Sequence, residues 1–262
     1  MKTLQFKKID AFTASGSSGN PAGYVLLTPG ESLSAADMQQ VARELKGFVN
    51  EVGFVFPQSR HYRLRYYSSE CEVAFCGHAS IAILYDLLNQ KPQAPAEVQI
   101  EVNAGRLTVY NDIPVSNAVY IMAPEPQYLP NPVNVAETAA ILGLSPDEIN
   151  PALPLRLIDA GLRTLIVPLT HLNTCLRLFP DQAALKIFCE SHEIDIIHVF
   201  TAETALPENR YRTRVFAPRF GYLEDPATGS GNSAFGFYLL DEKLWPGDFS
   251  IEQGPSATHP NV

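Results

Sequence analysis

Two short stretches of the chain, 152 residues apart, repeat one pattern and limit the folds open to the sequence. Residues 76–80 read Cys-Gly-His-Ala-Ser, and residues 228–232 read Thr-Gly-Ser-Gly-Asn. Each stretch leads into an apolar run with helical spacing. A small residue followed by glycine also opens many unrelated helices. These five positions alone are therefore compatible with an internal repeat and with a chance match between two ordinary helix starts.

The residues upstream extend the correspondence. We call each of these two stretches, where a strand leads into a helix, a joint. An aromatic run starts at Arg65 upstream of the first joint, and a similar run starts at Arg214 upstream of the second. Glu72 and Glu224 also correspond, again 152 residues apart. The repeat therefore predicts two related halves, each with a strand, a joint and a helix.

Two helix starts of this kind suggest a ligand. The first amides of a helix have no partner within the helix, and they carry a partial positive charge. Glycine in the joint lets a ligand approach the backbone closely. If the two joints face each other across a cleft, they hold a carboxylate or an enolate that forms beside it.

Composition narrows the class of protein. The chain has 262 residues, 46% of them hydrophobic, which is enough for one large domain or two smaller ones. Its 28 acidic and 19 basic residues give a formal charge of -9, which disfavours nucleic acid and anionic membrane surfaces as partners. Because no segment reaches the ~20 apolar residues of a membrane span, we expect a cytoplasmic protein.

Short runs rich in aromatic and β-branched residues predict strands. They lie at residues 3–12, 22–27, 51–56, 62–68, 97–103, 164–169, 195–201 and 210–218. Ser34 is a candidate N-cap for a helix whose apolar stripe is Met38, Val41 and Leu45. A second helix is expected near residues 135–144.

A proline-rich segment suggests the domain boundary. Residues 122–135 hold four prolines, which remove backbone donors and keep the chain extended. We expect a first lobe of residues 1–122, a linker of residues 123–135, and a second lobe of residues 136–262 whose tail can return to the first lobe.

Five segments together resemble a known family. They are "IDAFTASGSSGNPAGYVLL", "ARELKGFVNEVGFVF", "LRYYSSECEVAFCGHAS", "NAGRLTV" and "EDPATGSGNSAFG". The chain resembles the PhzF (phenazine biosynthesis-like) family within the diaminopimelate epimerase and proline racemase superfamily. The resemblance implies an α+β fold of two pseudo-repeated lobes, each an antiparallel sheet or barrel around a central helix. It also implies an active site between the lobes and no cofactor.

The resemblance assigns candidate site residues. The family's catalytic glutamate falls on Glu51, and further catalytic positions fall on His78 and Asp225. Substrate-binding positions fall on Asn20, Cys76, Gly77, Ala79, Thr228, Gly229, Ser230 and Gly231. Structural roles are also open, as a strand-end acid for Glu51, a helix cap for His78 and a turn former for Asp225.

Two departures from the family pattern are visible. Around Glu51 the family shows Ser-Glu-Thr-Ala-Phe, whereas this chain has Asn50, Val52 and Gly53. After "FSIEQG" the chain continues with "PSATHPNV" where the family has a glycine-arginine-proline-serine segment. This predicts an incompletely closed first lobe, or a partner subunit of a homodimer that covers the exposed edge.

The cysteine positions bear on whether the chain can act as a two-thiol racemase. Racemases of the superfamily use two thiols, but here Cys76 is matched by Thr228, whose hydroxyl is too weakly acidic to move an α-proton. The chain has no CxxC pairs and no histidine ligands next to its cysteines. We therefore expect reduced thiols at Cys71, Cys175 and Cys189, and no bound metal.

These features predict a cofactor-independent isomerase that shifts a proton on a small carboxylic acid, with Glu51 as the single acid/base. Two alternatives remain open. One is a hydroxy amino acid dehydratase or epimerase-like enzyme that uses Cys76 as the base and Thr228 as an acid. The other is a catalytically silent small-molecule binding protein.

Overall fold

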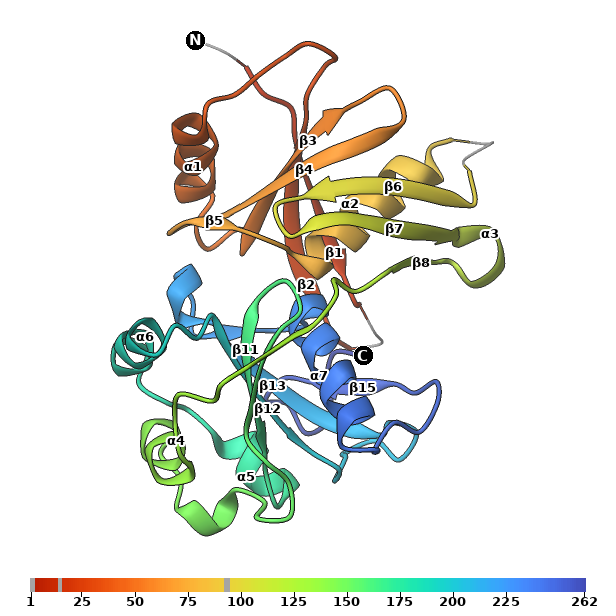
Figure 1. Cartoon of the computed structure of the whole chain (residues 1–262). Helices are drawn as coiled ribbons and strands as arrows, with labels where there is room; N and C mark the ends of the chain where they lie inside the picture. Colours follow the sequence, from red (N-terminus) through yellow and green to blue (C-terminus); the bar gives the residue numbers. More distant parts are fainter. Residues whose placement is uncertain (1–2, 14–15, 92–94) are drawn as a thin grey trace. The chain divides into compact units, whose positions relative to one another are not determined.

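A computed structural model describes residues 3–13, 16–91 and 95–262 of the chain. Ala14 and Ser15, within the first family-like segment, lie outside the described residues. The chain divides into two compact units (Figure 1). Unit 1 comprises Met1–Ala11 and Asn20–Pro124, and unit 2 comprises Phe12–Gly19 and Glu125–Val262.

Unit 1 has one sheet and three helices within its described residues. In chain order its elements are β1 (Phe6–Ala11), β2 (Asn20–Leu26), α1 (Ala35–Glu44), β3 (Glu51–Pro57), β4 (His61–Ser68), β5 (Glu72–Val73), α2 (Gly77–Asn89), β6 (Glu97–Val102), β7 (Gly105–Asp112), α3 (Ile113–Ser116) and β8 (Ala118–Ile121).

The sheet of unit 1 curls around α2. Its strands follow the order β1-β2-β3-β4-β6-β7-β8, with β5 beside β4. Helix α2 packs against both edge strands, β1 and β8, and also against β2 and β3. Most side chains of α2 are buried, which is expected of a helix that is apolar around its whole circumference.

Helix α1 covers another part of this sheet, as its sequence predicts. Ser34 is the N-cap and forms a capping box with Asp37. Met38 is buried with Val52, Phe54 and other residues of β2, β3 and β4. The predicted N-cap and apolar stripe of this helix are therefore confirmed.

Unit 2 is built in a similar way. Its elements are β9 (Gln127–Leu129), α4 (Val135–Leu142), β10 (Arg156–Asp159), β11 (Arg163–Pro168), α5 (Leu172–Arg177), α6 (Gln182–Ser191), β12 (Ile196–Thr201), β13 (Tyr211–Phe216), β14 (Glu224–Asp225), α7 (Gly229–Asp241) and β15 (Ile251–Gln253), with single 3-10 turns at Pro146–Glu148 and Pro218–Phe220.

The sheet of unit 2 separates two cores. Its strand order is β14-β13-β12-β11-β10-β9, with β15 beside β13. Along β11, Leu165 and Val167 join the core that includes α4, α5 and α6, while Ile166 joins the core under α7. This alternation follows from the two-residue period of a strand.

The element order shows the internal repeat. In unit 1, β4, β5, α2 and β6 follow one another, and in unit 2 β13, β14, α7 and β15 do the same. Helices α2 and α7 each have 13 residues, with Cys76 and Thr228 as their N-caps. The two similar sequence joints therefore open two equivalent helices.

The α+β class expected from the sequence is confirmed, with one correction to the sheets. Each contains parallel pairs as well as antiparallel ones, namely β2 with β3, β4 with β6, β11 with β12 and β13 with β15. Parallel neighbours need a crossover connection, and the helices between these strands supply it.

Two further findings bear on the sequence expectations. The proline-rich segment of residues 123–135 contains the short strand β9, which pairs with β10. The last residues of the chain stay within unit 2, where β15 pairs with β13. In the part of the chain that the structure describes, no helix has the length and apolar character needed to cross a membrane.

Candidate active site

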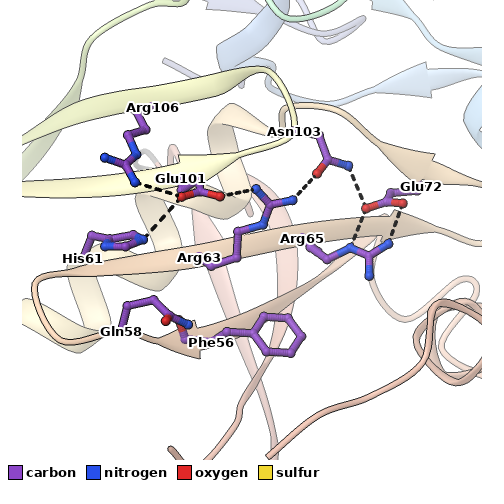
Figure 2. A network of polar contacts seen from close by, with 9 residues as sticks. All are labelled: Phe56, Gln58, His61, Arg63, Arg65, Glu72, Glu101, Asn103 and Arg106. Atoms are coloured by element: carbon purple, nitrogen blue, oxygen red, sulfur yellow. Dashed lines mark hydrogen bonds and ion pairs between the residues drawn. The ribbon is translucent and has the colours of Figure 1, made fainter. Parts of the chain in front are cut away.

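A network of polar side chains lies on β4 and β5, just before the first joint. Arg65 on β4 donates two hydrogen bonds to Glu72 on β5, at 2.7 and 2.8 Å. Asn103 also donates to Glu72, at 2.7 Å, and accepts a bond of 2.6 Å from Arg63 (Figure 2). The hydrogen bonds from Arg65 are the main reason that the pKa of Glu72 lies below its usual value. The network therefore holds β5 against β4 just before Cys76.

At the start of α2, a histidine lies between a carboxyl group and a thiol. Nε2 of His78 is 3.3 Å from Oε2 of Glu51. Nδ1 of the same ring is 3.4 Å from Sγ of Cys76. All three residues are at most 4% exposed. Each ring nitrogen of His78 thus faces a different proton-carrying group.

Close packing of α2 on β3 makes this contact possible. Glu51 is the first residue of β3, and Gly53 follows two positions later. A Cβ atom at Gly53 would lie only 2.4 Å from Cδ1 of Ile83 on α2. A larger residue at this position would require the end of the Ile83 side chain to move.

The two buried groups of this pair compete over the charge of the imidazole. An ionised Glu51 at 3.3 Å favours the imidazolium, whereas burial favours the neutral ring. With both side chains 3% exposed, burial decides, and it lowers the pKa of His78 to about 3. At neutral pH the ring is uncharged, so with Glu51 ionised Nε2–H faces the carboxylate and Nδ1 can accept from the thiol of Cys76.

Asn20 lies at the same end of the sheet. It is the first residue of β2, is completely buried, and accepts a hydrogen bond of 3.3 Å from Nδ2 of Asn50. In the adjacent ladder, Ala22 pairs with Glu51. The structure therefore brings together Glu51, Cys76 and His78, and it places Asn20 against Asn50, the residue before Glu51. Gly77 and Ala79, also predicted from the resemblance, are buried in the first turn of α2.

The second joint, in unit 2, is held by hydrogen bonds between side chains. The Thr228 hydroxyl donates to Oδ2 of Asp225 at 2.5 Å. Nε2 of Gln253 donates to that hydroxyl at 3.0 Å and to the Asp225 carbonyl at 2.8 Å. Oε1 of Gln253 accepts from the amide of Thr228 at 3.1 Å. The Thr228 hydroxyl thus both donates and accepts within a buried set.

The other predicted residues of unit 2 form the first turn of α7. Gly229, Ser230 and Gly231 are its first three residues, and Ser230 and Gly231 are buried. A Cβ atom at Gly231 would lie 3.2 Å from Nδ1 of His198, so the glycine lets this turn pack on the β12 histidine.

The sequence interpretation missed two residues, Gln253 and Asn261. Asn261 Nδ2 donates to the Pro226 carbonyl at 2.6 Å, and Oδ1 accepts from the amide of Gly19 at 3.1 Å. Its backbone pairs with that of Gln253 in both directions. Neither residue belongs to a motif that would single it out, because only the pairing of β15 with β13 brings this segment to the joint.

One group in the described residues has donor atoms suited to a metal ion. The donor atoms of Glu51, Cys76 and His78 all lie within 4.8 Å of one another. All four cysteines of the chain are free thiols, as the sequence predicts, and Cys175 and Cys189 are buried in the core of unit 2.

The strand order and the equivalent helix starts define an α+β protein built from two repeated units. The chain belongs to the phenazine biosynthesis-like family (PhzC-PhzF), whose sequence pattern matches residues 9–260. The resemblance seen in the sequence is thereby confirmed.

Individual relatives agree with this assignment. YfhB of Bacillus subtilis, named an uncharacterized isomerase, is 30% identical over 259 residues, which cover 97% of this chain and 87% of the relative. A PhzF-family protein from Bacillus anthracis has a crystal structure with a TM-score of 0.80 and 28% identity, covering 100% of this chain and 89% of that one. A predicted epimerase from Pseudomonas aeruginosa shares the fold, with a TM-score of 0.79 at 20% identity and coverage of 99% and 90%. The chain is thus an isomerase with the expected epimerase-like fold.

Proposed function

We propose that this isomerase shifts a proton between two carbons of a small carboxylic acid without a cofactor, with Glu51 as the single acid/base. One observation carries the proposal. The Glu51 carboxyl group is buried 3.3 Å from Nε2 of a histidine that burial keeps neutral. A carboxylate buried beside a neutral ring in this way can take a proton from carbon and return it.

The proposed reaction has two steps. In the first, the Glu51 carboxylate takes a proton from a carbon of the substrate, and the electron pair of the broken C–H bond delocalises into the adjacent π system. In the second, protonated Glu51 returns the proton to a nearby carbon on the same face. The product is an isomer of the substrate, and Glu51 ends as a carboxylate. Nε2 of His78 lies 3.3 Å from Oε2 of the carboxylate, so the neutral ring borders the oxygen that would carry the proton.

The helix start beside Glu51 supports a carboxylate substrate. The side chain of Cys76, the N-cap of α2, forms no capping hydrogen bond. The N-cap side chain therefore supplies no acceptor to the first amides of the helix, which are those of Gly77, His78 and Ala79. Their partial positive charge stabilises an anion.

We assign a related role to unit 2. There the first turn of α7 offers the amides of Gly229, Ser230 and Gly231, again without a cap from the Thr228 side chain. Asp225 accepts from Thr228 and thereby positions this turn.

The test is isomerisation of a panel of small unsaturated carboxylic acids in deuterated water, followed by NMR and mass spectrometry. We expect an isomeric product and a fall in rate of ~100-fold or more for Glu51→Gln. The matched control is Glu44→Gln, which changes an exposed acid in the same unit and should leave the rate unchanged. A Glu51→Gln variant that folds normally and keeps the native rate would overturn the proposal.

A second candidate follows from the thiol. Sγ of Cys76 lies 3.4 Å from Nδ1 of His78, and the Cys76 thiolate would be the base of an epimerase or dehydratase. The Thr228 hydroxyl, held between Asp225 and Gln253, is then the acid or water holder. Loss of water from the substrate, together with a Cys76→Ser rate as low as that of Glu51→Gln, would favour this candidate.

A further inference from the structure

We infer that Glu51, Cys76 and His78 form a binding site for Zn²⁺ or a chemically similar cation, and that the bound cation blocks the proton chemistry of Glu51. Binding stands on the geometry of the three side chains alone. Inhibition rests in addition on the proposed function, because it requires Glu51 to be the acid/base.

The spacing of the donor atoms fits such an ion. Zn²⁺ binds nitrogen and oxygen at ~2.0–2.1 Å and thiolate sulfur at ~2.3 Å, so two ligands of a tetrahedral ion lie roughly 3.3–3.6 Å apart. Nε2 of His78 is 3.3 Å from Oε2 of Glu51 and 4.0 Å from Sγ of Cys76. The donor atoms of all three residues lie within 4.8 Å of one another, so the Cys76 side chain has to rotate toward Nε2 and Glu51 for the three to bind one ion.

The donor set selects the class of cation. A thiolate, an imidazole and a carboxylate together suit Zn²⁺ and other borderline or soft divalent ions, whereas Mg²⁺ and Ca²⁺ prefer oxygen alone. Binding requires the thiolate form of the cysteine and a neutral imidazole, and three protein ligands leave a fourth position for a small molecule.

The surroundings hold the ligands in place. The Ser80 hydroxyl donates to the Cys76 carbonyl at 2.7 Å, and the Tyr66 hydroxyl contacts Ser80. Glu51 is fixed in the ladder opposite Ala22 and Ser68. Ligands held by neighbouring hydrogen bonds lose little freedom when a metal binds.

Occupancy has a direct chemical consequence. The Glu51 oxygen that faces His78 would become a metal ligand, and its lone pair would no longer accept a proton from carbon. Zn²⁺ should therefore compete with the substrate, and a chelator should restore the rate.

The binding experiment is a Co²⁺ titration of the full chain after treatment with EDTA, followed by displacement with Zn²⁺. We expect one equivalent of Co²⁺ to produce a thiolate-to-cobalt charge-transfer band. Cys76→Ser should remove the band and weaken Zn²⁺ binding by roughly 100-fold or more. Glu51→Gln should keep the band with weaker affinity, which shows that loss of a ligand and not loss of the fold is measured.

The matched control is Cys71→Ala, because Cys71 is the more exposed thiol of the same unit. This variant should bind as the wild type does. A band that survives Cys76→Ser but disappears in Cys71→Ala would overturn the inference, as would the absence of saturable Zn²⁺ binding. Zn²⁺ binding at Cys76 without inhibition would support the site and would contradict the role of Glu51 in the proposed function.

Discussion

At the scale of single residues, two buried histidines give the protein an expected sensitivity to acid. His198 on β12 is completely buried and stacks on Phe235, with ring centroids 4.9 Å apart. Neither of its ring nitrogens has a hydrogen-bond partner among the described residues. Burial lowers the pKa of His198, like that of His78, to about 3.

The sign of the pH effect follows from these values. An unfolded histidine has a pKa of ~6.5, so below that pH the unfolded chain takes up protons that the folded chain does not. The free energy of unfolding therefore falls as the pH drops from ~6.5 toward 3, by up to about 1.4 kcal/mol per pH unit for each buried histidine.

We predict that His198→Phe makes the free energy of unfolding less dependent on pH, by the contribution of one histidine. The replacement keeps the ring stack and removes the group that would be protonated on unfolding. Urea unfolding between pH 7 and pH 4.5 measures it. His259→Gln, at an exposed histidine, is the control and should leave the slope unchanged. An unaltered slope in His198→Phe would show that His198 is not a buried neutral group.

At the scale of elements, the internal repeat includes a matched pair of ion pairs. Arg214 on β13 donates two bonds to Glu224 on β14, at 2.8 and 2.7 Å, just as Arg65 does to Glu72. The environments differ. The Arg214 side chain is 2% exposed and also donates to three carbonyls of residues 175–178, whereas the Arg65 side chain is 25% exposed.

This difference predicts unequal costs for the same substitution. Arg214→Met should lower the free energy of unfolding by ~3 kcal/mol or more, because three carbonyls and Glu224 lose a buried donor. Arg65→Met, its counterpart in unit 1, should cost about 1 kcal/mol or less, because water can replace the lost bonds. Denaturant unfolding of both variants is the measurement, and equal losses would contradict the comparison.

At the scale of the whole molecule, unit 2 gathers segments from opposite parts of the chain. Residues 12–19 belong to it, although the strands before and after them belong to unit 1. Asn261 joins this segment, through Gly19, to the Pro226 carbonyl ahead of α7. Gly19 directly precedes Asn20, so one asparagine near the C-terminus supports a loop that leads to a predicted site residue.

We predict that Asn261→Ala raises the rate of hydrogen exchange at the amide of Gly19 and loosens residues 226–229, at a cost of about 1–2 kcal/mol in the free energy of unfolding. Hydrogen exchange followed by mass spectrometry provides the measurement. Thr258→Ala, at an exposed residue of the same segment, is the control and should behave as the wild type does. Unchanged protection in Asn261→Ala would show that the loop is held by other contacts.

Local elements of this protein can be predicted from the sequence alone. The cap at Ser34 and the stripe that includes Met38 act over a few residues, so they can be read without the fold. The same is true of the equivalent helix starts at Gly77 and Gly229, whose glycines and flanking small residues are local signals.

Which side chains meet in the candidate site depends on the tertiary structure. The contact of Glu51 with His78 depends on how α2 packs on β3, where the Ile83 side chain lies against Gly53. Gln253 reaches Thr228 because β15 pairs with β13 in parallel, a register that no local pattern specifies. The physical reason is that turns and caps depend on neighbours in the sequence, whereas strand register and helix packing depend on burying apolar surface contributed by distant segments.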